Sequence, residues 1–280
     1  MIQIDHLSFA YGGRRPAVFS DFALTLESGG IYGLLGKNGT GKSTLLYLIA
    51  GLLRPGRGSV RFLGQETRSR RPELLEELYL LPEEFTLPPV SLRRYAALNA
   101  PFYPRFSAGL FAQCLRDFDL APTDNLAELS MGQRKKAIVS FALATNTRLL
   151  LMDEPTNGLD IPSKSQFRRV VARSMTEGRT LVVSTHQVHD VEALIDRVVM
   201  LDGGRLLLDR SVADICARLC FEERPAGSPV DDALYVQPTV HGNAVVRRND
   251  DGRDTPLDLE LLFGALLERP DLWEQATDKR

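Results

Sequence analysis

The sequence predicts an α/β fold in which parallel strands form a sheet that helices cover on both faces. Two continuous apolar runs, Thr147–Asp153 and Arg179–His186, are bounded by polar turns, as is typical of strands buried on both faces. A third run, Gly29–Gly36, precedes Ser43–Leu53, which has no breaker before Gly51 and is long enough for a helix. Strands that alternate with helices in this way indicate a parallel sheet.

The N-terminal residues 2–27 predict antiparallel strands instead. Phe22, Leu24 and Leu26 alternate with less apolar residues, which is the period of a strand with one buried face. Further short strands are expected at Ser59–Leu63 and Leu78–Leu81.

An aromatic segment within residues 85–146 predicts an inserted helical subdomain. Its aromatic side chains are interleaved with charged residues, and Pro101 and Pro104 interrupt it. Because proline ends helices, several short helices are expected here.

The C-terminal quarter predicts a small α+β appendage. The core is expected to end near Leu208, and the later segment ERPAGSP has the composition of a linker. The segments ALYVQP and GNAVVRR predict a hairpin, and NDDG predicts a turn. Thr255 as N-cap and Pro256 in the first turn predict a helix start. We therefore divide the chain into a domain of residues 1–210 and an appendage of residues 211–280.

The composition argues against several classes of protein. A net charge of −2 gives no electrostatic reason to expect a nucleic acid or a membrane surface as partner. No apolar run is long enough to span a membrane, and the N-terminus lacks the pattern of a signal peptide. We expect a soluble, cytoplasmic protein. Three cysteines are too few for a disulfide framework and are expected to pack in the interior.

The glycine-rich stretch between the third strand and its helix predicts a phosphate site. The spacing of Gly36, Gly41, Lys42 and Ser43 fits the P-loop pattern GxxxxGK[ST]. Glycines let successive N–H groups converge on phosphate oxygens at the positive end of a helix. Lys42 would neutralise the β- and γ-phosphates, and the Ser43 hydroxyl would ligate Mg²⁺. The alternative is a glycine-rich turn that fits the pattern by chance.

Two carboxylates follow the apolar strand that ends at Asp153. Beside a P-loop, Asp153 can hold the Mg²⁺ water shell, and Glu154 can orient and polarise the attacking water. The alternative is a strand that simply ends in solvated acids.

The segment LSMGQRKKA predicts a second helix start with an anion site. Ser130 and Gly132 would expose backbone N–H groups there. Because the P-loop already encloses the phosphates from one side, we expect this site to serve a nucleotide held by another copy of the protein. The alternative is an N-capped helix whose Arg134, Lys135 and Lys136 form a solvated face.

Two further residues are expected to contact the nucleotide directly. His186 ends a core strand at the polar edge, where it can sense the γ-phosphate. Tyr11, beside two glycines, can stack on adenine. A structural histidine and a tyrosine that packs at a strand end are the alternatives.

Together these segments resemble the ATP-binding cassette (ABC) ATPase family. GKNGTGKST is similar to its Walker A motif, LSMGQ to its signature, LLLMDE to its Walker B motif and NGLD to its D-loop, and His186 resembles its switch histidine. The resemblance covers residues 1 to about 210. It implies a P-loop NTPase fold with a RecA-like core, an antiparallel β edge and a helical subdomain. It also implies ATP and Mg²⁺ as cofactors and two nucleotides held between head-to-tail subunits.

The resemblance and the residue chemistry together define the expected site. The residues expected to bind ATP are Tyr11, Gly36, Lys37, Asn38, Gly39, Thr40, Gly41, Lys42, Ser43, Thr44, Ser130, Gly132 and Gln133. Glu154 and His186 are expected to be catalytic. Ser43, Glu83 and Asp153 are expected to act on the metal.

The sequence departs from the family pattern at two places. The signature usually reads LSGGQ, and Met131 replaces its first glycine. The loop after Leu78–Leu81 usually offers a glutamine to Mg²⁺ and water, but this chain has Glu83, or Glu84 if the alignment shifts by one residue. An anionic side chain there would bind metal more tightly or perturb the water.

The resemblance implies an ATPase subunit that drives separate membrane-spanning chains, on the inner face of the cell membrane. The sequence segments around FYPRFSAGLF and THQVHDVEALIDRVVML most resemble those of bacterial ATPases that pair with export-type permeases. An export-type permease is therefore the expected partner. The partner in the ATP dimer would be a second copy or a homologous subunit. The alternatives are a soluble ABC ATPase of translation or DNA repair and an ATP-gated regulator that scarcely hydrolyses ATP.

Overall fold

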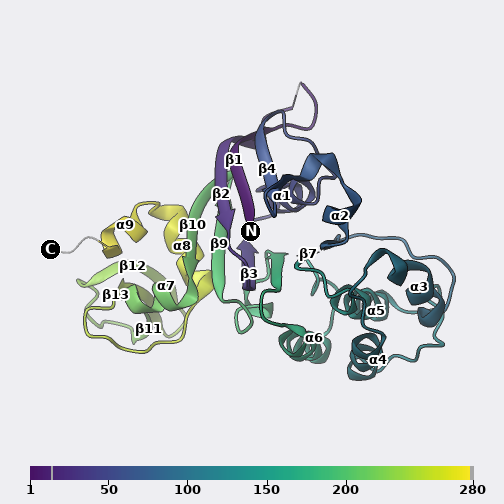
Figure 1. The fold of residues 1–280 in the computed structure, drawn as a ribbon. Coiled ribbons are helices and arrows are strands. Elements are labelled where there is room, and N and C mark those ends of the chain that lie inside the picture. Colours follow the sequence, from purple (N-terminus) through teal and green to yellow (C-terminus); the bar gives the residue numbers. More distant parts are fainter. Residues whose placement is uncertain (14, 278–280) are drawn as a thin grey trace.

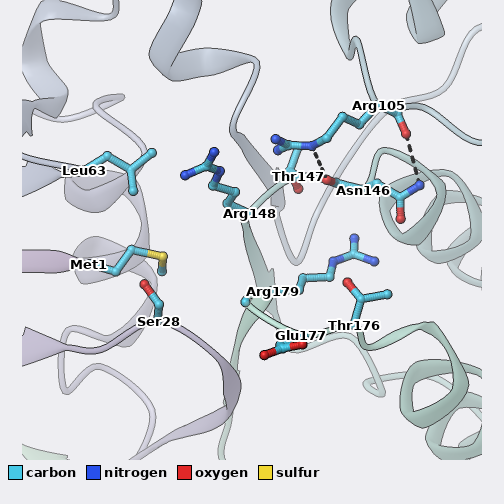
Figure 2. A pocket seen from close by; sticks show the side chains of 11 residues that line it. Met1, Ser28, Leu63, Arg105, Asn146, Thr147, Arg148, Thr176, Glu177 and Arg179 are labelled. Carbon is cyan, nitrogen blue, oxygen red and sulfur yellow. Dashed lines mark hydrogen bonds between the residues drawn. The ribbon is translucent and has the colours of Figure 1, made fainter.

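The computed structural model describes residues 1–13 and 15–277. Figure 1 shows a central sheet with an antiparallel sheet above it, a group of helices on one side and a small α+β unit on the other. The predicted α/β class with an antiparallel edge and helical segment is confirmed. Within the described part of the chain, no helix is long and apolar enough to cross a membrane.

The central sheet has the strand order β10-β9-β3-β8-β7-β6, and only the β9–β10 pair is antiparallel. Every side chain of β7 and β8 is buried, as predicted for strands that are covered on both faces. The strands are β3 (Gly30–Leu35), β6 (Leu78–Leu81), β7 (Leu149–Asp153), β8 (Thr180–Thr185), β9 (Arg197–Asp202) and β10 (Arg205–Ser211).

Helix α1 (Lys42–Ile49) lies between the central sheet and the antiparallel sheet. Its Leu45 and Leu46 share one core with Ile4 of the antiparallel sheet and Leu151 of the central sheet. The antiparallel sheet has the order β2-β1-β4-β5. Its strands are β1 (Ile2–Phe9), β2 (Phe19–Leu26), β4 (Arg57–Phe62) and β5 (Gln65–Glu66), so β4 begins and ends slightly earlier than predicted.

The turn between β9 and β10 presses against the start of β2. A Cβ on Gly204 would lie only 1.9 Å from the carbonyl oxygen of Val18, and Gly204 has a φ of 75°. Glycine is therefore required at this turn for both conformation and space.

The predicted helical segment packs around one aromatic side chain, Phe141. Its ring lies 5.2 Å from Tyr95, 5.3 Å from Phe106 and 6.2 Å from Phe111, measured between ring centroids. These aromatic pairs explain why the segment has its distinctive composition. The elements here are α3 (Leu92–Asn99), η2 (Ala100–Phe102), α4 (Ala108–Asp117) and α5 (Met131–Ala144). Two short elements, η1 (Thr67–Ser69) and α2 (Pro72–Leu75), precede this segment and lie between β5 and β6 in the chain.

The elements after β10 form the C-terminal unit. Its sheet has the order β11-β13-β12, and β12 and β13 form the predicted hairpin. Its elements are α7 (Val212–Arg218), β11 (Leu219–Pro225), β12 (Ala233–Thr239), β13 (Gly242–Arg248), α8 (Leu259–Glu268) and α9 (Leu272–Thr277). Two further elements belong to the core: α6 (Ile161–Ser174) connects β7 to β8, and η3 (Val188–Asp190) lies between β8 and β9.

Two predictions for this unit are wrong in detail. The expected linker begins inside strand β11, which pairs with β13 along its full length. The N-cap of α8 is Asp258 and not Thr255, because Asp258 accepts the Leu261 N–H at 2.8 Å. The Thr255 hydroxyl instead accepts the N–H of Phe221 in β11. All three cysteines are free thiols, and Cys114 and Cys220 are buried.

Candidate functional site

The predicted site residues gather at the carboxyl ends of three adjacent strands. Strands β3 and β7 both pair with β8 in parallel, so their carboxyl ends lie at one edge of the sheet. Residues 36–44 follow β3, Asp153 ends β7, and His186 follows β8. This edge is where ligands bind in open α/β sheets.

The P-loop backbone requires glycine at two positions. Gly41 has a φ of 103°, and a Cβ there would lie 2.8 Å from Cζ of Phe19. A Cβ on Gly36 would lie 2.6 Å from the carbonyl oxygen of Leu201. The loop is therefore held between β2 and the end of β9, with the N-terminus of α1 at its end.

Lys42 is held inside the loop that precedes it. Its side chain is buried, and Nζ donates to the carbonyl oxygens of Gly36 at 2.7 Å and Lys37 at 3.1 Å. Glu154 Oε1 lies 3.9 Å from the same ammonium. Burial lowers the pKa of Lys42, and the charges of Glu154 and Asp153 oppose that shift. The result is a buried cation whose nearest carboxylate lies beyond normal hydrogen-bond distance.

Other predicted P-loop residues have mixed environments. The Thr40 hydroxyl donates to the Lys37 carbonyl at 2.9 Å, and Asn38 is exposed. The Tyr11 hydroxyl lies 3.0 Å from Thr44 Oγ1. The structure thus brings Tyr11 to the P-loop, where 42% of its surface is exposed and its ring packs edge-on against Phe9.

Asp153 carries a polar atom that is poised for a ligand. Ser184, on the neighbouring strand, donates to Asp153 Oδ1. Oδ2 is buried and has no hydrogen-bond partner among residues 1–13 and 15–277. Burial raises the pKa of Asp153, while the hydrogen bond from Ser184 opposes the rise. A buried acceptor without a partner is costly, so its presence points to a missing ligand.

These groups fit a magnesium ion. Mg²⁺ is held by one or two protein oxygens together with water and phosphate, and Asp153 and Ser43 supply such oxygens. The described residues contain no cluster of three His, Cys, Asp or Glu that would hold a metal alone. Two protein oxygens, from Asp153 and Ser43, are suited to a Mg²⁺ ion whose other ligands are water and the phosphates of a nucleotide.

Glu154 is fixed by strand β8 and the residues after it. Oε2 accepts the Thr185 hydroxyl at 2.9 Å, and Oε1 accepts the His186 N–H at 3.0 Å. His186 Nδ1 lies 2.7 Å from the same oxygen. The backbone of Glu154 has a φ of 44°, and such strained conformations cluster at functional sites. Glu154 and His186 therefore form a connected pair, as their predicted roles require.

Glu83 also reaches this edge, whereas the side chain of Glu84 is exposed. Glu83 Oε1 accepts a hydrogen bond from Asn157 Nδ2 at 2.9 Å. No role was predicted for Asn157, although it lies in the NGLD segment. The signal was available, because a polar amide three residues beyond a predicted catalytic carboxylate can reach the same loop.

Lys135 is the second residue that the sequence interpretation missed. A solvated face of Arg134, Lys135 and Lys136 was the alternative considered, and for Lys135 it is wrong, because only 5% of its surface is exposed. Its position three and four residues before the buried Ile138 and Val139 could have indicated this. Burial lowers its pKa, and the charges of nearby carboxylates, Glu83 first, oppose that shift.

The signature segment begins helix α5 as predicted. The Ser130 hydroxyl accepts the Gln133 N–H at 3.3 Å, and Gln133 Oε1 accepts the Ser130 N–H at 3.0 Å. This capping box fixes the first turn while Met131 remains 76% exposed. In the described part of the chain, no hydrogen bond joins residues 130–133 to residues 36–44.

Comparisons with known proteins agree with this geometry. The sequence pattern of the ABC transporter family matches residues 19–157. A Listeria monocytogenes protein named as an ABC transporter ATP-binding protein is 30% identical over 251 residues, which cover 85% of this chain and 89% of the relative. A solved ATP-binding subunit of an ABC transporter superposes with a TM-score of 0.68 at 26% identity, covering 77% of this chain and 91% of that one.

Relatives named for both directions of transport also match. The Nod factor export ATP-binding protein I of Cupriavidus pinatubonensis is 30% identical over 71% of this chain and 63% of its own length. The molybdenum import ATP-binding protein ModC of Mycobacterium tuberculosis is 34% identical over 74% of this chain and 61% of its own length.

The fold and the edge of the sheet define a P-loop nucleoside triphosphatase. Its P-loop, capped signature helix and buried carboxylates follow one another along the chain, and the relative from Listeria monocytogenes matches over most of that chain. The chain belongs to the family of ABC transporter ATP-binding proteins and is an ATPase of that family.

Proposed function

We propose that this protein hydrolyses Mg-ATP as one half of a head-to-tail dimer and that dimer closure drives a separate membrane permease. The observation that carries the proposal is the convergence of Lys42, Asp153 and Glu154 at one edge of the sheet. A buried cation and two buried carboxylates at one edge suit a triphosphate, its metal and a water.

The P-loop would bind the triphosphate. Backbone N–H groups of residues 36–44 would surround the phosphate oxygens, and Lys42 would exchange its two loop carbonyl partners for the β- and γ-phosphates. Ser43 and Asp153 would hold Mg²⁺, which supplies neutralisation of the charge on the phosphates. Glu83 would act on the same metal from the loop after β6. Tyr11 would stack on the adenine.

Glu154 would act as the water-activating carboxylate. Its carboxylate is oriented by Thr185 and by the backbone and ring of His186. A base held by three hydrogen bonds needs little reorganisation before it accepts a proton. His186 would contact the γ-phosphate. Its contact with Glu154 would then couple the presence of that phosphate to the position of the carboxylate.

The second subunit would complete each site. Ser130, Gly132 and Gln133 lie at a helix N-terminus that, within residues 1–13 and 15–277, makes no hydrogen bond to the P-loop of the same molecule. An anion site of this kind fits the free side of a nucleotide held by another molecule. We propose that residues 1–210 form this nucleotide-binding domain and that residues 211–280 form an appendage.

The permease partner is proposed to be of export type, with the ATPase on the inner face of the membrane. The match to the Nod factor export protein supports this direction, while the match to ModC shows that import relatives exist as well. Co-purification with an integral membrane protein from solubilised membranes is the expected result. A stable complex with ribosomes or DNA would instead support the soluble class of ABC ATPase.

The dimer and the catalytic carboxylate are tested together by Glu154→Gln. We expect this variant to bind ATP, to lose hydrolysis by at least about 100-fold, and to elute as a dimer with Mg-ATP. Glu76→Gln, an exposed change of the same kind, should keep the parental rate and elute as a monomer once its ATP has been hydrolysed. Parental hydrolysis by Glu154→Gln would remove Glu154 from the proposed role. Elution of Glu154→Gln as a monomer with bound Mg-ATP would contradict the proposed head-to-tail dimer.

A further inference from the structure

A buried lysine connects the signature helix to the catalytic loop of the same molecule. Lys135 lies in the second turn of α5, and its Nζ donates to the carbonyl oxygen of Glu154 at 2.8 Å and to that of Asn157 at 2.9 Å. It forms no ion pair with a carboxylate within the described residues. The Lys135 ammonium donates its hydrogen bonds to two backbone carbonyls, so these bonds hold the main chain of residues 154–157 in place.

The carbonyls that Lys135 contacts belong to a strained turn. Glu154 has left-handed backbone geometry, and the chain reverses direction immediately after it. The Asn157 N–H also donates to the Glu154 carbonyl, at 3.2 Å, and the Asn157 side chain holds Glu83. Lys135 therefore fixes the backbone that orients the Glu154 side chain. It also fixes the backbone of Asn157, whose side-chain amide donates to Glu83.

The same helix presents the signature residues to solvent. Ser130 caps α5 through the capping box, five residues before Lys135 on a continuous helix. A rotation or shift of α5 would thus move both the signature and the backbone of the catalytic carboxylate. A rigid helix that contacts both sites is a physical route for coupling between them.

We propose that Lys135 is a positioning residue for ATP hydrolysis, which holds the Glu154 turn in its active geometry and couples it to the signature helix. The proposal rests on the proposed function, because the signature of one molecule is assigned there to the nucleotide of its partner. Engagement of the signature by one ATP would then adjust the carboxylate that acts on the other ATP.

Lys135→Met tests this role, because methionine fills a similar volume without a donor. We expect kcat per ATP-binding site to fall about 10- to 100-fold, since misplacement of a reacting group lowers kcat. The Kd for ATP should stay within twofold, because the Lys135 ammonium donates to the backbone of Glu154 and Asn157, neither of which is predicted to bind phosphate. The dependence of rate on ATP concentration should also become less cooperative.

Lys136→Met is the matched control. Lys136 is the next residue on the same helix, and it contacts the side chains of Gln166 and Phe118. We expect its kcat to change by less than twofold. Lys135→Gln keeps a donor on a shorter side chain and should recover part of the lost kcat, so it provides the test if Lys135→Met does not fold.

The outcomes separate this proposal from the function on which it rests. A parental kcat in Lys135→Met and Lys135→Gln overturns the positioning role. Loss of ATP binding together with kcat also overturns it, because that pattern indicates a structural lysine. The double variant Lys135→Met/Glu154→Gln should still dimerise with Mg-ATP. If Glu154→Gln alone fails to dimerise, the proposed function fails instead, whatever Lys135→Met does.

Discussion

The nucleotide edge and the C-terminal unit use charged residues in opposite ways. At the edge, Asp153 has a buried oxygen with no hydrogen-bond partner among the residues that the structure describes, and Glu154 Oε1 lies 3.9 Å from Lys42 Nζ. In the C-terminal unit, Arg247 contacts both Glu222 and Asp251, and Arg224 contacts Asp232. Incompletely paired buried charges indicate a ligand site, whereas fully paired charges stabilise a structure. The comparison explains why one region binds ATP and why no ligand is assigned to the other.

The two regions meet beside His186. Glu192 Oε1 accepts the N–H of Leu259 at the start of α8, at 2.9 Å. His189 Nε2 lies 2.8 Å from Glu260 of the same helix. His189 and Glu192 follow His186 by a few residues in the chain. Helix α8 therefore contacts the segment that carries His186, the predicted γ-phosphate sensor.

The largest effect on ATP binding is expected from Lys42→Ala. Loss of a cation that binds two phosphates should weaken ATP binding about 10- to 100-fold, by isothermal titration with Mg-ATP. The folded C-terminal unit should be unaffected, because Lys42 contacts none of it. A Kd within threefold of the parent would contradict the assignment of Lys42.

Leu262→Ala should show the reverse pattern. Leu262 is fully buried in α8, and its truncation should cost about 2 to 5 kcal/mol of unfolding free energy. Trp273 is the only tryptophan in the chain and lies in α9, so its fluorescence during urea unfolding reports this region. ATP affinity should stay within twofold. A large loss of affinity would show that the regions are not independent.

Acid should weaken the C-terminal unit through Glu222. A hydrogen bond from Arg247 holds the pKa of Glu222 below its usual value of 4.5. The stability from this pair is therefore fully present above about pH 4.5 and is lost as the pH falls through the lower folded pKa. Arg247→Met should flatten this acid dependence of the Trp273 transition. An unchanged slope between pH 5 and pH 3 would exclude Glu222 as its source.

The smallest effect is expected at the contact between the regions. Burial lowers the pKa of His189, but hydrogen bonds and charges from Glu260 and Glu192 raise it more, and the net shift is upward from 6.5. The stabilisation is therefore present below about pH 6.5 and is lost as the pH rises through the folded pKa. Because His189 is largely exposed, Glu260→Gln should change Tm by no more than about 2 °C at pH 6 and less at pH 8. A larger change at pH 8 would contradict this sign.

The sequence predicted the core well because its signals are local. The strands β6, β7 and β8 follow continuous apolar runs, and the P-loop and Glu154 follow motifs of a few residues. Lys135 was not predicted to be buried, because its partners are carbonyl oxygens of a loop far along the chain. The start of α8 was misplaced because Thr255 is a good N-cap by composition, yet its hydroxyl is used by β11. Local patterns do not reveal which distant strand competes for a hydroxyl.

The glycine in the β9–β10 turn has a consequence for how the protein tolerates mutation. Val18, whose carbonyl leaves no room for a side chain at Gly204, is followed by Phe19, and both side chains lie against Gly41. A substitution at residue 204, on the hairpin whose second strand leads into the C-terminal unit, would push this pair toward the phosphate loop. A random library screened for growth should therefore show intolerance at residue 204, a buried glycine that lies outside the P-loop.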